Sequence, residues 1–135
     1  MCLLDTFSIN NDRGVSISVA PRMGPQQIHD LQDSHCDALW VSVKVNSTVL
    51  MIGNIYVNLS ATSPNNLSAC LRNIQNAFDY CNKYSIKDIL IVGDFNSRHI
   101  SWGDTISNNN GKELAAFIGQ HNLTCITPNL SLIHI

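Results

Sequence analysis

Charged residues are scarce in this chain, and the sequence also lacks the features that mark several large classes of protein. Only 13% of the 135 residues are charged, and the net charge at pH 7 is −2. Complete nucleic-acid-binding domains usually carry a clear excess of basic residues, and this sequence has none. No stretch approaches a membrane span, and the apolar start at residues 1–4 is too short for a secretory signal peptide. We therefore expect no membrane partner.

Paired cysteines are also missing. The chain has five cysteines, an odd number, at wide spacings and without a Cys-x-x-Cys pair: Cys2, Cys36, Cys70, Cys81 and Cys125. This pattern argues against a zinc site and against a disulfide framework. We interpret these residues as buried free thiols in a reducing compartment. The hydrophobic content of 44% indicates a globular chain, either one domain or part of one.

The first half of the chain has the alternating pattern of β-strands. Residues 15–19 predict an amphipathic strand closed by a proline, and the polar residues 22–34 predict a loop. Residues 38–45 and 48–57 predict a hairpin. We expect its first strand to be half exposed, with Trp40 on the face opposite the aliphatic residues, and its second strand to be central.

A helix and a further strand follow. Residues 67–81 repeat apolar residues at spacings of three and four, which predicts an amphipathic helix that covers a sheet. Residues 88–94 predict a strand, and its apolar run at 89–92 is typical of burial on both faces. Strand, helix and strand imply a crossover and parallel pairing. Tyr56 and Asp94 should then leave the same edge of one sheet.

Two more elements are expected near the end of the chain. A turn at residues 108–111 can cap a second helix, whose inner face includes Leu114, Phe117 and Ile118. Residues 123–126 start another strand.

Polar side chains gather directly after the 88–94 strand. A carboxylate, a carboxamide, a guanidinium and an imidazole follow one another within six residues, at Asp94, Asn96, Arg98 and His99. Open sheets place ligands beyond the carboxyl ends of their strands. Asp94 can accept a proton from water or hold a divalent cation, and Asn96 can donate and accept hydrogen bonds. The alternative from these residues alone is a solvated Asp-Asn turn.

The same segment carries a resemblance to a known family. The run Gly93-Asp94-Phe95-Asn96-Ser97-Arg98-His99 is followed by Trp102-Gly103, by Asn110-Gly111 and by residues 114–123. It resembles the endonuclease/exonuclease/phosphatase superfamily and, more narrowly, the endonuclease domains of jockey-type non-LTR retrotransposons. The resemblance runs from about residue 13 to 128. It implies an α/β fold, a partial four-layer sandwich of two packed β-sheets flanked by helices, with the N- and C-terminal strands missing.

The resemblance also implies roles for single residues. Asp94 would orient and deprotonate the attacking water, Asn96 would hydrogen-bond the reacting phosphate, and Tyr56 would contact that phosphate from the neighbouring strand. Arg98 and His99 follow as candidates for contacting the flanking DNA phosphate or for holding the loop. Trp102 can lean on a sugar or base of the DNA, and the favoured alternative is that it anchors its loop by burial. Magnesium is the implied metal, because hard oxygen ligands at a phosphate site suit it.

The implied protein nicks DNA, acts in the nucleus of a cell, and continues into a reverse transcriptase domain of the same polyprotein. The family's complete site also needs an asparagine and a metal-binding glutamate before this chain begins, and an aspartate with an Asp-His pair after it ends. None has a counterpart here, and the single glutamate, Glu113, lies elsewhere. We therefore expect an internal fragment without robust nuclease activity.

Two other functions stay open, together with the assignment of the last residues. A phosphatase of the same superfamily would use the same Asp-x-Asn geometry, and a non-enzymatic remnant or interaction fragment would use neither residue. Residues 130–135 match the translation of a transposase-tagging sequencing adapter. We interpret residues 1–129 as a partial endonuclease/exonuclease/phosphatase domain and residues 130–135 as an adapter-derived tail.

Overall fold

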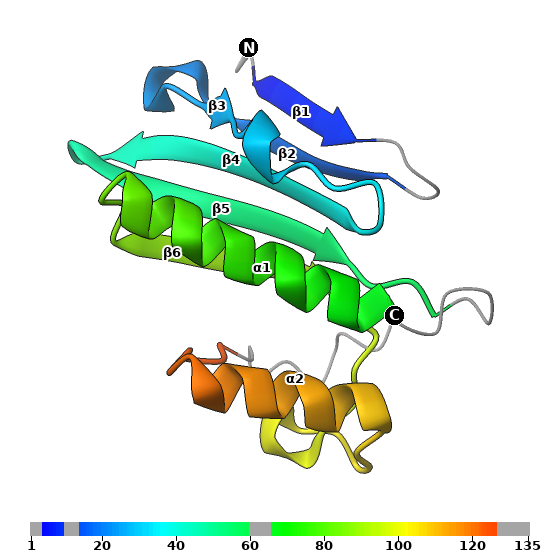
Figure 1. The fold of residues 1–135 in the computed structure, drawn as a ribbon. Helices are drawn as coiled ribbons and strands as arrows, with labels where there is room; N and C mark the ends of the chain where they lie inside the picture. The colour runs from blue at the N-terminus through cyan, green and yellow to red at the C-terminus, as the bar shows by residue number, and fades with distance from the viewer. Residues whose placement is uncertain (1–3, 10–13, 60–65, 127–135) are drawn as a thin grey trace. The chain divides into compact units, whose positions relative to one another are not determined.

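The structure, a computed structural model, describes residues 4–9, 14–59 and 66–126 as an α/β fold with two sheets (Figure 1). The chain divides into two compact units, the first unit at residues 1–95 and the second unit at residues 96–135. The first unit contains β1 (Asp5–Ile9), β2 (Val15–Val19), β3 (Gln26–Gln27), β4 (Asp37–Val45), β5 (Thr48–Tyr56), α1 (Asn66–Lys83) and β6 (Asp88–Asp94). Residues 130–135, interpreted above as an adapter-derived tail, lie outside the described residues.

Two sheets pack face to face in the first unit. Strands β1 and β2 form an antiparallel pair, and the larger sheet has the order β3-β4-β5-β6. Between them lies a core to which β1 and β2 contribute Ile9, Val15 and Val19 and to which β4 contributes Leu39 and alternate valines. The predicted strand at 15–19 and the predicted hairpin are confirmed. The predicted loop before the hairpin is interrupted by β3 and two short 3₁₀ turns, because β3 pairs with β4.

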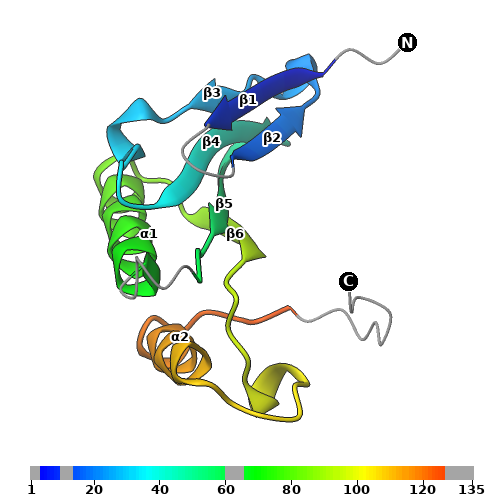
Figure 2. The same cartoon turned by 90° about the vertical axis from the view of Figure 1, so that its right-hand side faces the viewer.

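Helix α1 covers the opposite face of the larger sheet (Figures 1 and 2). On that face Trp40 is only 1% exposed, and its indole N–H donates to Asn73 Oδ1 of α1 over 2.7 Å. Its ring lies over Gly53, its neighbour on β5, where any Cβ would run into the ring. The expectation of a half-exposed first hairpin strand was therefore wrong. The strand is buried on both faces because a helix later in the sequence covers the Trp40 side.

The predicted amphipathic helix is confirmed as α1. Its apolar stripe is buried, including both cysteines expected there, Cys70 and Cys81. The described part of the chain contains four free cysteines and no disulfide. Two polar residues of the same stripe, Asn66 and Asn73, are also buried, which the hydrophobic period does not reveal. No helix among the described residues is both long and apolar enough to cross a membrane.

Strand β6 pairs with β5 in parallel, as the crossover predicted. It forms the last strand of the larger sheet, however, and it is not buried on both faces. Leu90 and Val92 are 39% and 42% exposed. The apolar run at residues 89–92 has the pattern of a central strand, because a sequence pattern shows only which residues are apolar. It does not show whether another element covers each face of the strand.

The second unit contains a 3₁₀ turn, η3 (Ile100–Trp102), and the helix α2 (Asn109–Gln120). The helix confirms the second predicted helix, and its expected cap is Asn108, whose Oδ1 accepts from Gly111 N over 2.7 Å. The strand expected at 123–126 is absent, because these described residues form no regular secondary structure. A strand needs a neighbouring strand to satisfy its backbone groups.

Candidate active site

Tyr56 and Asp94 lie side by side at one edge of the larger sheet. Each is the last residue of its strand, and the parallel register pairs them directly. Beyond the pair, Val57 N donates to Asp94 O over 2.8 Å. Because successive side chains alternate between the faces of a sheet, the two paired residues point to the same face. The prediction that both residues leave the same sheet edge is confirmed.

Gly93 sets how closely the two strands approach just before Asp94. Its φ of 141° lies in a region that L side chains rarely adopt, and a Cβ there would run into the carbonyl of Ile55 on β5. The glycine that ends the apolar run is therefore needed for the backbone geometry of the site as well as for stopping the strand.

The end of β5 is also held by side chains that the sequence did not single out. Asn58 N donates to Asn66 Oδ1 of α1 over 2.7 Å, and Cys70 Sγ lies 3.9 Å from Tyr56 O. On the other side of β5, the buried Asp37 is the register partner of Tyr56. The hydrophobic period places Cys70 on the buried stripe of α1, but it does not reveal that Cys70 and Asn66 contact the end of β5, which is distant in the sequence.

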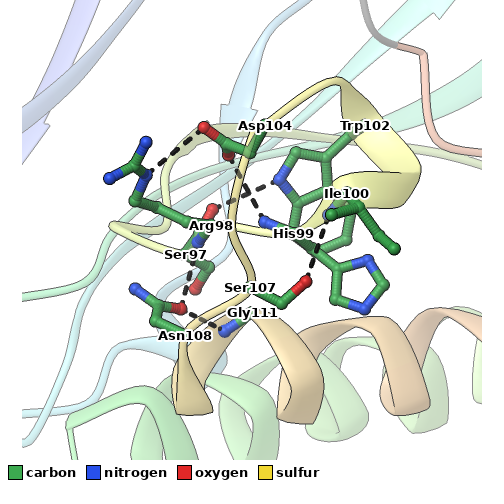
Figure 3. A network of polar contacts seen from close by, with 9 residues as sticks. All are labelled: Ser97, Arg98, His99, Ile100, Trp102, Asp104, Ser107, Asn108 and Gly111. Atoms are coloured by element: carbon green, nitrogen blue, oxygen red, sulfur yellow. Dashed lines mark hydrogen bonds and ion pairs between the residues drawn. The ribbon is translucent and has the colours of Figure 1, made fainter.

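Asn96 is the first residue of the second unit and has a left-handed φ of 47°. Asparagine adopts this conformation more readily than most residues do. The residues that follow form a polar network, drawn in Figure 3. Asn108 Oδ1 accepts from Arg98 N over 3.1 Å, and Arg98 O accepts from Asn108 N over 2.9 Å. Gly111 lies so close to the Arg98 carbonyl that no Cβ fits there.

Asp104 holds two of the predicted DNA-binding residues in place (Figure 3). Its Oδ1 pairs with Arg98 Nε over 3.3 Å, and its Oδ2 accepts from His99 N over 3.3 Å. The Arg98 side chain is about half exposed, so this ion pair is accessible to solvent. The sequence did not identify this carboxylate, because nothing in its spacing distinguishes it from an ordinary loop aspartate.

His99 and Trp102 pack together, with ring centroids 5.0 Å apart. His99 Nδ1 accepts from Ser101 N over 3.1 Å, and the Trp102 indole donates to Ser97 O over 3.3 Å. Because Nδ1 accepts a backbone N–H, the neutral imidazole carries its proton on Nε2. Trp102 is half-buried, so it anchors the loop while part of its surface stays accessible.

The first unit thus brings together Tyr56 and Asp94, and the second unit brings together Arg98, His99 and Trp102. The exposed Asp94 offers carboxylate oxygens at a strand end, which is the type of ligand that Mg²⁺ prefers. Among the described residues, no three His, Cys, Asp or Glu side chains form a group that could hold a metal ion. The Asp94 carboxylate is the kind of ligand that suits magnesium, and it would supply part of a coordination shell.

A comparison with family models identifies the chain. A model described as endonuclease-reverse transcriptase matches residues 50–133, more than half of the sequence. The chain belongs to this family. The matched region includes β6 and all but the first two residues of β5. The family resemblance stated in the sequence analysis is confirmed.

A solved structure of similar fold is the endonuclease domain of TRAS1, a telomere-specific non-LTR retrotransposon. It has 18% sequence identity and a TM-score of 0.67, and the likeness covers 87% of this chain and 52% of that one. At this identity the likeness shows the fold alone, and the chain spans about half the length of the TRAS1 chain. No curated protein matches the sequence.

Proposed function

We propose that this member of the endonuclease-reverse transcriptase family contributes Tyr56, Asp94 and Asn96 to a magnesium-dependent site that nicks DNA. The direct register pairing of Tyr56 with Asp94 at the carboxyl ends of two parallel strands carries the proposal. Family membership and the endonuclease fold support DNA as the substrate. The same membership supports a reverse transcriptase domain in the same polyprotein. Action in the nucleus is proposed from the resemblance alone.

Each residue has a definite chemical task in phosphodiester hydrolysis. Asp94 accepts the proton of the attacking water, because its carboxylate is the only ionised acceptor among the three. The Tyr56 hydroxyl and the Asn96 amide donate hydrogen bonds to the non-bridging oxygens, where negative charge develops. Asp94 would be one of the residues holding Mg²⁺, which when bound would neutralise charge at the phosphate.

The loop of the second unit supplies groups suited to flanking DNA. The Arg98 guanidinium can pair with a phosphate, and His99 Nε2 is left to donate because Nδ1 is occupied. The exposed part of Trp102 suits stacking against a sugar or base. These contacts position the duplex and carry no chemistry.

Nicking of supercoiled plasmid in Mg²⁺ tests the proposal, with the 135-residue chain and with the longest reading frame at its source locus. We expect Asp94→Asn to lower the nicking rate of the active form at least a hundredfold, which is typical for loss of a general base. Asp88→Asn is the matched control, since Asp88 is an exposed aspartate at the opposite end of β6. It should leave the rate within twofold.

We further propose that the 135-residue chain alone nicks slowly, because Asp94 is the only carboxylate of the family pattern that it contains. Robust nicking by the chain that is lost in Asp94→Asn would overturn this second proposal and support the first. Preferential hydrolysis of a phosphomonoester would identify a phosphatase instead. Absence of both activities in both forms would identify a non-enzymatic remnant.

A further inference from the structure

Asn66, the first residue of α1, has a buried polar side chain that hydrogen-bonds to the backbone just after β5. It is 8% exposed, and both atoms of its amide are used. Oδ1 accepts from Asn58 N over 2.7 Å, and Nδ2 donates to His35 O over 3.1 Å. Cys70 Sγ also lies 3.8 Å from Oδ1. The side chain therefore joins the chain after β5 to the chain before β4.

Three polar groups of the backbone at Tyr56, Val57 and Asn58 have hydrogen-bond partners on neighbouring elements. The Tyr56 carbonyl faces Cys70 Sγ, Val57 N donates to Asp94 O, and Asn58 N donates to Asn66. β5 ends at Tyr56. Beyond it, Val57 N still bonds to Asp94 of β6, whereas Asn58 N bonds to a side chain of α1. Buried backbone groups need partners, and at Asn58 a side chain of α1 takes the place of a ladder bond.

We propose that Asn66 is a positioning residue of the candidate site, which fixes the end of β5 and thereby the direction of Tyr56 toward Asp94. The inference rests on the proposed function. Val57 links the two strand ends directly, so movement of the segment after Tyr56 also moves the point where Asp94 is held. A displacement of about 1 Å at a reacting group can lower a rate about a hundredfold.

Asn73 provides a matched control within the same helix. It is also buried, and it also uses Oδ1 as an acceptor and Nδ2 as a donor to a backbone carbonyl. Its partners are the Trp40 indole of β4 and the carbonyl of Leu31, which ends the 3₁₀ turn at His29–Leu31. Loss of either asparagine removes two side-chain hydrogen bonds, which are buried at Asn73 and part-buried at Asn66. Of the two, only Asn66 contacts the segment that follows Tyr56.

The test measures amide hydrogen exchange at Asn58 in the 135-residue chain, and nicking in the form that is active. Asn66→Ala should speed exchange at Asn58 at least tenfold and lower kcat at least tenfold with little change in KM. Asn73→Ala should lower Tm by about as much as Asn66→Ala does. It should leave the exchange rate at Asn58 and kcat within twofold of the wild-type values. Asn66→Asp keeps the acceptor for Asn58 N and should restore slow exchange there, because an acidic residue is favoured at a helix N-terminus.

Equal effects of Asn66→Ala and Asn73→Ala on Asn58 exchange would overturn the inference, and so would fast exchange in Asn66→Asp while the helix remains folded. If exchange follows the expectation and no form nicks DNA, Asn66 does hold the backbone at Asn58, and the proposed function fails. If nicking occurs and kcat is the same in Asn66→Ala and Asn73→Ala, the function stands and the positioning role fails.

Discussion

At the scale of single residues, the candidate site depends on backbone geometry as much as on its functional side chains. Gly93 lies against the Ile55 carbonyl with a φ of 141°, and the next residue is Asp94. The position of the Asp94 carboxylate is thus set by a residue that has no side chain. Arg98 and His99 are set in a similar way by Asp104.

Gly93→Ala should destabilise the first unit by about 2–4 kcal/mol, because the new Cβ meets backbone and the φ is strained for alanine. Chemical unfolding followed by circular dichroism measures the change. Gly119→Ala is the control, since Gly119 lies in α2 with open space around a built Cβ. It should stabilise by about 0.5–1 kcal/mol. Equal stability of the Gly93→Ala variant and the wild type would contradict the prediction.

Asp104→Asn should increase the affinity for DNA several-fold and steepen its salt dependence by about one unit of slope, because it releases one cation for phosphate contact. An asparagine oxygen can still accept from His99 N, so the loop should keep its conformation. The exposed ion pair contributes only about 0–1 kcal/mol to stability. Fluorescence anisotropy across a salt series measures the affinity. An unchanged slope, or the same gain in an Arg98→Gln background, would show that Arg98 does not bind DNA.

The site residues that could be predicted from the sequence are placed by the strands themselves, whereas those that could not be predicted are placed by contacts of the completed fold. Tyr56 and Asp94 were predictable, because strand periodicity and the crossover rule place strand ends without knowledge of side-chain contacts. Asn66 and Asp104 were not predictable, because each binds backbone whose position depends on the completed fold. Polar residues of this kind have no period to detect.

At the scale of elements, the sequence predicted which segments are strands and helices better than what covers them. Trp40 was placed on an exposed face because its covering helix is contributed only by residues 66–83. Strand β6 was taken as central, although it is the last strand of its sheet among the described residues. Burial depends on the neighbours of an element, whereas the hydrophobic period depends on the element alone.

The exposed face of β6 gives an element-scale prediction. Leu90→Thr should change the stability of the chain by less than about 1 kcal/mol, because Leu90 is 39% exposed and threonine suits a strand. Met51→Ala should cost about 2–5 kcal/mol, because Met51 is fully buried on the α1 side of β5. Urea unfolding of both variants makes the comparison. A Leu90→Thr loss as large as that of Met51→Ala would mean that this face of β6 is covered.

At the scale of the whole molecule, the buried thiols link stability to pH. A hydrogen bond to Cys70 and burial together raise the pKa of the Cys36 thiol far above its ordinary value of 9.0. Burial also raises the pKa of Cys81. A folded chain that keeps thiols protonated binds more protons than the unfolded chain once the pH exceeds the ordinary thiol pKa. Stability from these groups is therefore fully present below about pH 8.5 and falls as the pH rises beyond it.

We expect the free energy of unfolding to fall between pH 8.5 and 10.5, with each such thiol contributing up to about 1.4 kcal/mol per pH unit. Cys36→Ala should make this fall shallower, even if the variant is less stable at neutral pH through lost packing. Cys125→Ala is the control, because Cys125 is exposed in the second unit, and its profile should follow that of the wild type. Chemical unfolding at a series of pH values gives the slopes. If Cys36→Ala loses stability as steeply as the wild type, proton binding by Cys36 does not stabilise the folded chain, and the alkaline loss comes from other groups.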